Sequence, residues 1–330
     1  MNAGSLRRSH PSYCTVTIRR LFVLALGPPL LIGGAYALSH PGANRQQVEF
    51  AARVVQAETR TARYRASEHE SLTRSCTLAA DELGGRLPDD CTVLVRTPFV
   101  IAGDSSESEL DRLYATAIQP VTEALWRTYF DQRPDRPVVI VALRNETSYR
   151  NVARILDGYE PSAYAGYTQR GQRRIVLNAG TGAGTLTHEL AHVLALFDFP
   201  EMPEWFDEGL AALHEEAEFA PDGLTMIGRP NWRSRLLRES LTTEDLPSLS
   251  RVIRTPSFRG EGENLNYALV RSFCLYLQER GLLAHFYRKF RMAVDDDPSG
   301  LLTLCELLGV TSHADIDRDF RAWLAKQPRG

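Results

Sequence analysis

Apolar residues recur along the chain with two different spacings, and these spacings predict its helices and strands. Leu110, Leu113, Ala117, Val121 and Leu125 follow one another at intervals of three or four residues, which is the period of an amphipathic helix spanning about 107–129. Residues 137–143 form instead a short, continuous apolar run, as expected of a strand buried on both faces. The same reading predicts strands at 92–101, 162–168 and 174–178, and helices at 46–83, 146–156, 267–277, 282–290, 301–308 and 316–324.

The order of these elements predicts an α+β fold with an uneven distribution of strands. Strands and helices are mixed over 92–216, whereas the chain after Glu216 is mostly helical. The strands at 162–168 and 174–178 are separated by a loop suited to a hairpin. We therefore expect four regions, at 1–40, 41–91 (helical), 92–228 (α+β) and 229–330 (helical).

Composition is that of a globular protein. The chain has 330 residues, 43% of them hydrophobic and 24% charged, which excludes disorder of the whole chain and a multispan transporter. The formal net charge is −3, so composition offers no basic surface for nucleic acid, and none is expected as a partner. Length leaves room for roughly two domains.

The N-terminal 38 residues differ from the rest. Four arginines and no acidic residue occur in residues 1–37, so all 41 acidic residues belong to the remainder. A basic stretch, the apolar run 21–38 and the small residues Ala35 and Ala37 predict a signal peptide or, if uncleaved, a transmembrane anchor that holds the protein at a membrane. Either reading places the protein outside the cytoplasm, in the periplasm, at the membrane or secreted.

The cysteine count is consistent with an oxidising compartment. Cys14 lies in the basic N-terminal stretch, which leaves Cys76, Cys91, Cys274 and Cys305. Four cysteines allow two disulfides in three connectivities, and proximity in sequence favours Cys76–Cys91 and Cys274–Cys305.

The strongest chemical motif is His188-Glu189-Leu190-Ala191-His192. Two histidines at i and i+4 on a helix lie on one face, one turn apart, so their imidazoles can converge on one Zn²⁺ ion. Glu189 lies to the side of this face, where a general base can take a proton from a zinc-bound water. The rest of the helix is almost entirely apolar, and burial of these three side chains without a metal would be costly.

A catalytic zinc takes three protein ligands, so a third is expected nearby. Pro200 and Pro203 end the first helix and begin a second, and Glu208 on that second helix is the preferred ligand. Asp207 and His214 stay open as alternatives. A metzincin continuation is excluded, because positions 195 and 198 are Ala195 and Asp198 rather than glycine and histidine.

HELAH, a proline-containing turn and then PEWFDEGLA resemble the gluzincin zinc metallopeptidases, and specifically the peptidase-MA-like family of bacterial exported proteins. The resemblance covers about 92–325 and is specific over 185–216. It implies His188, His192 and Glu208 as zinc ligands with Glu189 as base. It also implies a small mixed sheet that precedes the zinc helices and whose edge strand binds the substrate backbone, followed by a helical C-terminal half.

Two further sites follow from this resemblance. The edge strand corresponds to Ala163, Tyr164, Ala165, Gly166 and Tyr167, with Gly166 permitting close backbone approach. Tyr267, at the start of a helix, corresponds to the tyrosine that donates a hydrogen bond to the oxyanion in gluzincin aminopeptidases.

The sequence departs from those aminopeptidases at two points. Their G-x-M-E-N motif is absent, since the strand reads SAYAGYT, so endo- and exopeptidase action both stay open. Ala212, one turn after Glu208, cannot act as a carboxylate that orients a zinc ligand.

The expected activity is hydrolysis of peptide bonds in a peptide or protein by an exported zinc metallopeptidase. The alternative is a catalytically silent, zinc-stabilised binding or scaffold protein of the cell envelope, for which the long helix at 46–83 would serve as an interaction arm.

Overall fold

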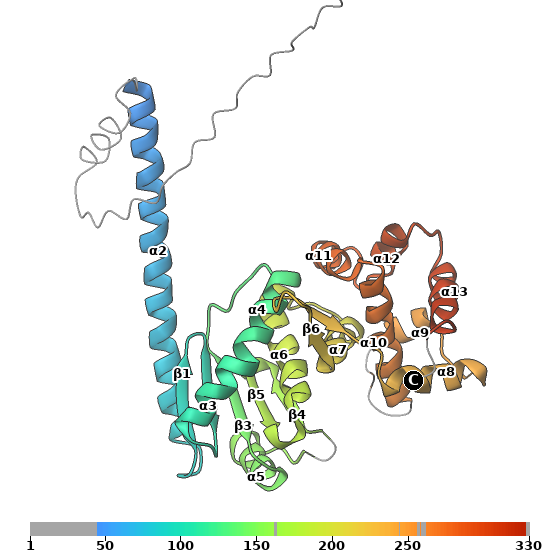
Figure 1. Ribbon diagram of the computed structural model, residues 1–330, viewed down its shortest axis with the longest axis horizontal. Helices are drawn as coiled ribbons and strands as arrows, with labels where there is room; N and C mark the ends of the chain where they lie inside the picture. Colours follow the sequence, from blue (N-terminus) through green and yellow to red (C-terminus); the bar gives the residue numbers. More distant parts are fainter. Residues whose placement is uncertain (1–44, 162–163, 244, 256–257, 259–261, 328–330) are drawn as a thin grey trace, which may run out of the picture. The chain divides into compact units, whose positions relative to one another are not determined.

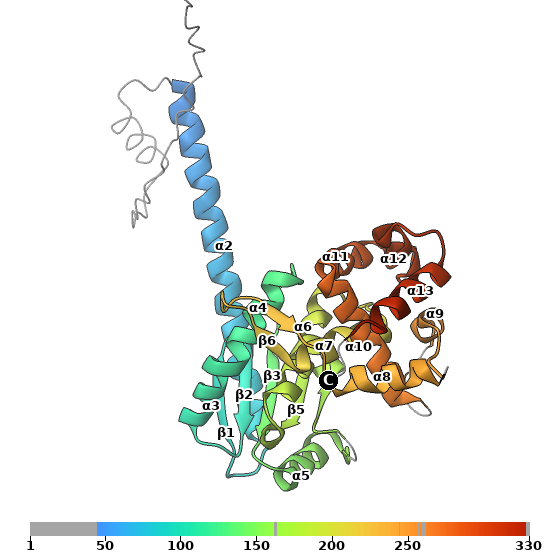
Figure 2. The same ribbon diagram turned by 45° about the vertical axis from the view of Figure 1, so that its right-hand side comes forward.

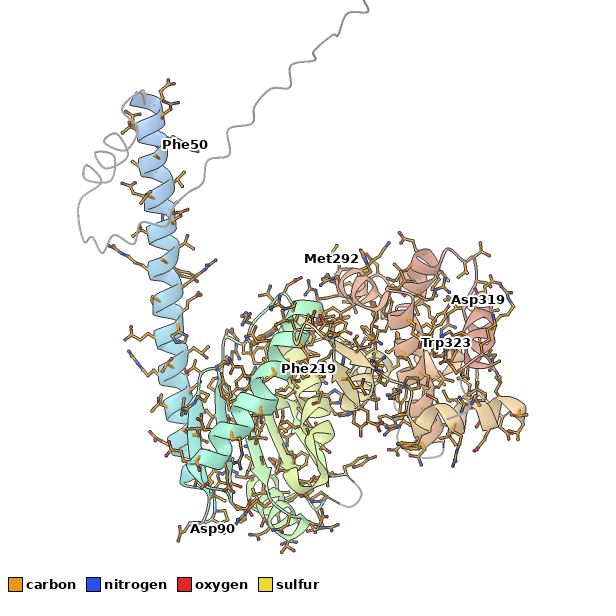
Figure 3. All side chains as sticks on the ribbon, in the orientation of Figure 1. Phe50, Asp90, Phe219, Met292, Asp319 and Trp323 are labelled. Atoms are coloured by element: carbon orange, nitrogen blue, oxygen red, sulfur yellow. The ribbon has the colours of Figure 1, made fainter. Side chains whose placement is uncertain are left out.

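The computed structural model describes residues 45–161, 164–243, 245–255, 258 and 262–327. The chain divides into two compact units, 1–67 and 68–330. The described part of the first unit, 45–67, is helical and mostly exposed, and Phe50 projects from it with 69% of its surface accessible (Figure 3). This stretch begins helix α2 (Arg45–Gly84), whose bounds agree with the predicted helix at 46–83.

A five-stranded mixed sheet forms the centre of the second unit, in the order β1-β2-β3-β5-β4 (Figure 1). Its strands are β1 (Thr92–Arg96), β2 (Phe99–Gly103), β3 (Val138–Leu143), β4 (Gly166–Gln169) and β5 (Arg174–Asn178). β2, β3 and β5 run parallel, while β1 and β4 pair antiparallel at the two edges. The predicted strand at 92–101 is therefore a hairpin of two strands, and the predicted hairpin at 162–178 is β4 with β5.

Both faces of the sheet are covered by helices, which explains the continuous apolar run in β3. Ile101 and Ile140 face a core shared with helices α4 (Gln119–Thr128) and α6 (Ala183–Asp198). Val100 and Val141 face a second core shared with α5 (Glu146–Asp157) and the end of α2. Adjacent residues of one strand thus contribute to different cores, as the two-residue period of a strand requires.

The helices around the sheet follow the predicted pattern, with one interruption. They are α3 (Glu107–Leu113), α4 (Gln119–Thr128), α5 (Glu146–Asp157), α6 (Ala183–Asp198) and α7 (Glu204–Glu215), with short helical turns η1 (Tyr114–Ile118), η2 (Arg170–Gln172) and η3 (Ala179–Thr181). The π-helical turn η1 joins α3 to α4, so the predicted helix at 107–129 is continuous but not α-helical throughout.

The C-terminal part is helical, as predicted, except for a small two-stranded sheet of β6 (Ala217–Phe219) and β7 (Met226–Gly228). Its helices are α8 (Trp232–Thr242), α9 (Leu249–Ile253), α10 (Glu263–Glu279), α11 (Leu283–Ala293), α12 (Leu301–Leu308) and α13 (His313–Leu324). α7 lies between α6 and these helices, packing against α6 on one side and α10 on the other (Figure 2). The α+β class is thereby confirmed.

The predicted disulfides are wrong, because all four described cysteines are free. Cys76 is buried on α2 with Sγ 3.5 Å from the carbonyl oxygen of Pro98, while Cys91 is only partly buried. Cys274 is buried on α10 against α7, and Cys305 lies on α12. Cys76 and Cys91 border one hydrophobic core and Cys274 and Cys305 another, yet no disulfide joins either predicted pair.

The expected transmembrane anchor finds no support. No helix among the described residues has the length and apolar character needed to cross a bilayer. The apolar run 21–38 itself lies outside the described residues.

Candidate metal centre

The two motif histidines lie on one face of α6. This helix is buried along most of its length because Leu186, Leu190 and Leu194 pack into the core. His188 and His192 are one turn apart, and their Nε2 atoms approach to 3.1 Å. The predicted convergence of the two imidazoles is therefore present in the structure.

Glu208 of α7 completes the group. Residues 199–203 connect α6 to α7, and Pro203 precedes the first residue of α7. Oε2 of Glu208 lies 3.5 Å from Nε2 of His188 and 3.5 Å from Nε2 of His192. The three residues are the one set of His, Cys, Asp or Glu side chains in the described chain whose ligand atoms cluster tightly enough to hold a metal, all within 4.8 Å of one another.

The spacing of these atoms fits a zinc ion. Tetrahedral coordination with bonds of about 2.0–2.1 Å separates each pair of ligand atoms by about 3.3 Å. The three separations between Nε2, Nε2 and Oε2 are 3.1, 3.5 and 3.5 Å, which bracket that value. Two imidazoles and one carboxylate are also a donor set that zinc accepts.

The electrostatics of the group favour a cation between these side chains. Burial alone would lower the pKa of His192, but the charges of Asp207 and Glu208 outweigh it and hold this pKa well above its ordinary value. Burial would likewise raise the pKa of Glu208, but His192 and His188 lower it well below its ordinary range. Glu208 is therefore a carboxylate rather than a carboxylic acid, as a metal ligand must be.

Asp207, left open as a ligand from the sequence, occupies a different position. Its Oδ1 lies 2.8 Å from Nδ1 of His192, on the side of the ring opposite Nε2. Its Oδ2 accepts a hydrogen bond of 2.7 Å from Nη1 of Arg170. Asp207 thus orients the His192 ring from the side opposite Nε2, a role that Ala212 cannot fill.

His214, the other alternative ligand, is away from the group. It is buried near the end of α7, and its Nε2 lies 3.0 Å from the hydroxyl of Tyr129. Burial and the charge of Arg271 lower its pKa to about 4, so His214 is neutral at physiological pH.

The expected base, Glu189, is buried beside the histidines and is held by the edge strand. Its carboxylate Oε2 accepts a hydrogen bond of 2.7 Å from Oγ1 of Thr168 on β4. A Cβ atom at Gly166 would lie 3.4 Å from Cγ of Glu189 and 2.7 Å from Cγ2 of Thr185. Glycine at 166 therefore permits the strand to approach α6.

The segment expected to bind substrate lies partly in β4, which is an edge strand. Gly166 and Tyr167 belong to β4, Tyr164 and Ala165 precede it, and Ala163 lies outside the described residues. The Tyr167 ring faces away from the metal group, since its hydroxyl donates a hydrogen bond of 2.7 Å to Oδ2 of Asp157. The role of this edge in substrate binding stays a prediction.

Tyr164 reaches from this segment to the start of α10. Its hydroxyl donates to the carboxylate of Glu263, and both residues line a cavity of about 570 Å³ with α8. Tyr267 lies one turn further along α10, with its ring 5.8 Å from that of Phe258. The catalytic role of Tyr267 stays a prediction.

Thr168 and Arg170 are site residues that sequence reasoning missed, and Asp207 was considered there only as a possible ligand. Strand alternation offered a usable pattern for Thr168, which falls on the same face of β4 as Gly166. Comparison with known proteins adds no assignment: neither a scan of protein-family models nor a search of curated proteins gave a match.

Proposed function

We propose that the chain is a zinc-dependent metallopeptidase that resembles the gluzincins. The observation that carries the proposal is the spacing of the Nε2, Nε2 and Oε2 atoms of His188, His192 and Glu208, which matches tetrahedral zinc. Glu189, buried beside them, supplies the base that a purely structural zinc site does not need.

The residues of the centre divide the chemistry among themselves. His188, His192 and Glu208 would hold the ion, which when bound supplies Lewis acidity toward the scissile carbonyl and the attacking water. Glu189 accepts a proton from that water and returns it to the leaving amine. Tyr267 is proposed to donate a hydrogen bond to the oxyanion.

The proposed substrate is a peptide or protein segment in extended conformation. Among the described residues, β4 pairs with β5 along one edge and with no strand along the other, so a peptide backbone could add as a further strand beside Glu189. The basic and apolar N-terminus favours export, which would place the activity outside the cytoplasm.

The scaffold alternative rested on two observations, the absence of an orienting carboxylate at Ala212 and the long helix α2. Asp207 beside His192 weakens the first of these, and the second stays. The alternative predicts tightly bound zinc with no turnover, and the same experiment decides it.

The test combines metal analysis with cleavage of a peptide library by the wild-type protein, Glu189→Gln and Glu201→Gln. We expect about one zinc per chain in all three. Glu189→Gln should lower cleavage by a factor of about 10²–10⁴, the usual contribution of a general base. The control Glu201→Gln changes an exposed carboxylate between α6 and α7 and should cleave as wild type. Wild-type protein without zinc, or an active Glu189→Gln variant, contradicts the proposal.

A further inference from the structure

Strand β4 contacts the metal centre through alternate residues. Side chains at i and i+2 of a strand share a face, and Gly166, Thr168 and Arg170 follow this spacing to the end of β4 and the first residue of η2. Gly166 lies against Glu189 and Thr185, Thr168 bonds to Glu189, and Arg170 bonds to Asp207. One face of the strand thus reaches both the proposed base and the residue behind a metal ligand.

The first contact fixes the carboxylate of Glu189. Oε2 of Glu189 accepts a hydrogen bond of 2.7 Å from the hydroxyl of Thr168, and only 7% of the Glu189 surface is exposed to solvent. No other hydrogen bond to this carboxylate is found among the described residues. Thr168 alone therefore decides which oxygen of Glu189 is engaged and which is available to accept a proton.

The second contact fixes His192 through two links. Arg170 donates from Nη1 to Oδ2 of Asp207 at 2.7 Å, and Oδ1 of Asp207 lies 2.8 Å from Nδ1 of His192. The Asp207 side chain is 9% exposed, whereas Arg170 is 46% exposed. A buried carboxylate held on one oxygen by arginine presents its other oxygen to the imidazole in a fixed direction.

We infer that Thr168 and Arg170 are positioning residues of the centre, Thr168 for Glu189 and Arg170, through Asp207, for His192. The inference rests on the proposed function only in that His192 is a zinc ligand and Glu189 is the base. The strand proposed to bind the substrate backbone along its outer edge is, on this reading, also the strand that aligns the catalytic groups.

The Arg170 link is tested by zinc affinity, which requires no peptide substrate. Arg170→Gln and Asp207→Asn should each weaken zinc binding, measured by competition with a chromogenic chelator, by a factor of about 10–100. The double variant should bind no more weakly than Asp207→Asn alone, because both changes break one chain of contacts. Arg170→Lys should recover part of the loss.

The control for this link is Arg229→Gln, which removes an exposed ion pair of 2.9 Å with Glu218 and should leave zinc affinity unchanged. If Asp207→Asn fails to fold, the half-exposed Arg170 still allows the test through Arg170→Gln. If the wild-type protein binds zinc and Arg170→Gln binds it equally tightly, the Arg170 assignment is overturned and the proposed function stands.

The Thr168 link is tested by separating kcat from KM. Thr168→Val should lower kcat for a cleaved library peptide about tenfold or more, with KM and zinc affinity unchanged, and Thr168→Ser should restore kcat because it keeps the hydroxyl. The matched control is Thr128→Val. It removes a hydroxyl that donates a hydrogen bond of 2.8 Å to the backbone oxygen of Ala124 within α4, and it should leave kcat unchanged. Equal loss in the Ser and Val variants overturns the Thr168 assignment.

The outcomes separate the inference from the function on which it rests. Wild-type protein that binds no zinc overturns both. Zinc binding that weakens in Arg170→Gln while no library peptide is cleaved supports the Arg170 link and contradicts the peptidase.

Discussion

At Gly166, strand β4 lies close to α6. A Cβ atom there would stand 2.7 Å from Cγ2 of Thr185 and 3.1 Å from Cβ of Leu177, both closer than packing tolerates. Gly166→Ala should push the strand away from α6 and lower peptide cleavage at least tenfold, since small displacements of catalytic groups are costly. Gly171→Ala, where a Cβ atom meets open space, should cleave as wild type. Equal activity of both variants would contradict this reading of β4.

At the residue scale, the sequence predicted that His188, His192 and Glu208 cluster, but not which side chains surround them. Helical spacing alone brings His188 and His192 to one face, and Glu208 follows from the resemblance and the short connection between helices. Asp207 was read as a possible ligand because sequence does not fix how α7 is rotated about its axis. Its neighbour in space, Arg170, is 37 positions away, and only the folded sheet brings the two together.

His214 should make stability depend on pH in a defined window. Its pKa is lowered to about 4 by burial and by the charge of Arg271, against an ordinary value near 6.5. Between these values the unfolded chain binds a proton that the native protein does not, so stability is lost as pH falls from about 6.5 toward 4. Over this pH range the free energy of unfolding should fall by about 3 kcal/mol because of His214.

The measurement is urea unfolding of wild type and His214→Gln at pH 7 and 4.5. Glutamine preserves a donor toward Tyr129 but does not titrate. The free energy of unfolding of His214→Gln should therefore fall less than that of wild type across this pH range. His285→Gln, which removes an exposed imidazole on α11, serves as control and should follow wild type. Identical pH slopes for wild type and His214→Gln would show that His214 protonates equally in both states.

At the scale of elements, periodicity predicted most helices but not the breaks between them. The π-turn η1 keeps the apolar positions of its neighbours on one side, so the pattern over 107–129 carries no sign of it. β6 and β7 have three residues each, too few for a two-residue period to be recognised. The packing of α7 on α10 is set by Gly209, where a Cβ atom would lie 2.9 Å from Sγ of Cys274.

The end of α6 is fixed by Asp198, whose buried carboxylate binds two other segments, residues 131–132 and helix α11. Oδ1 accepts from the backbone nitrogens of Asp131 and Gln132 at 2.8 and 2.7 Å, and Oδ2 accepts 2.9 Å from Tyr287 and pairs with Arg291. Asp198→Ala should cost about 3–5 kcal/mol in the free energy of unfolding, because it leaves the two backbone N–H groups and the Tyr287 hydroxyl without this acceptor and breaks the ion pair with Arg291. Asp135→Ala, at an exposed ion pair, should cost under about 0.5 kcal/mol. A loss below about 1 kcal/mol for Asp198→Ala in urea unfolding would contradict the assignment.

At the scale of the second unit, the two halves predicted from sequence share one hydrophobic core. That core runs from Leu94 of β1 to Leu324 of α13. Trp205 and Phe206 of α7 pack against Phe286 of α11, with ring centroids 5.9 and 4.9 Å apart. The change from mixed to helical composition near residue 228 therefore marks a change of architecture within one core. Sequence pattern could not reveal this, because it reports which face is apolar but not what covers it.

Zinc should stabilise this whole unit, because the proposed ligands come from two helices, α6 and α7, that belong to its core. An ion that binds only the folded chain adds about 2.7 kcal/mol at a free concentration 100 times its Kd. At about 2–4 °C per kcal/mol for a unit of this size, Tm should rise about 5–10 °C over the chelator-treated protein. The variant His192→Ala should show no such rise, while Glu189→Gln, which leaves the ligands intact, should match wild type. If zinc does not raise the Tm of the wild-type protein, the proposal that this site binds zinc is contradicted, whatever activity is measured.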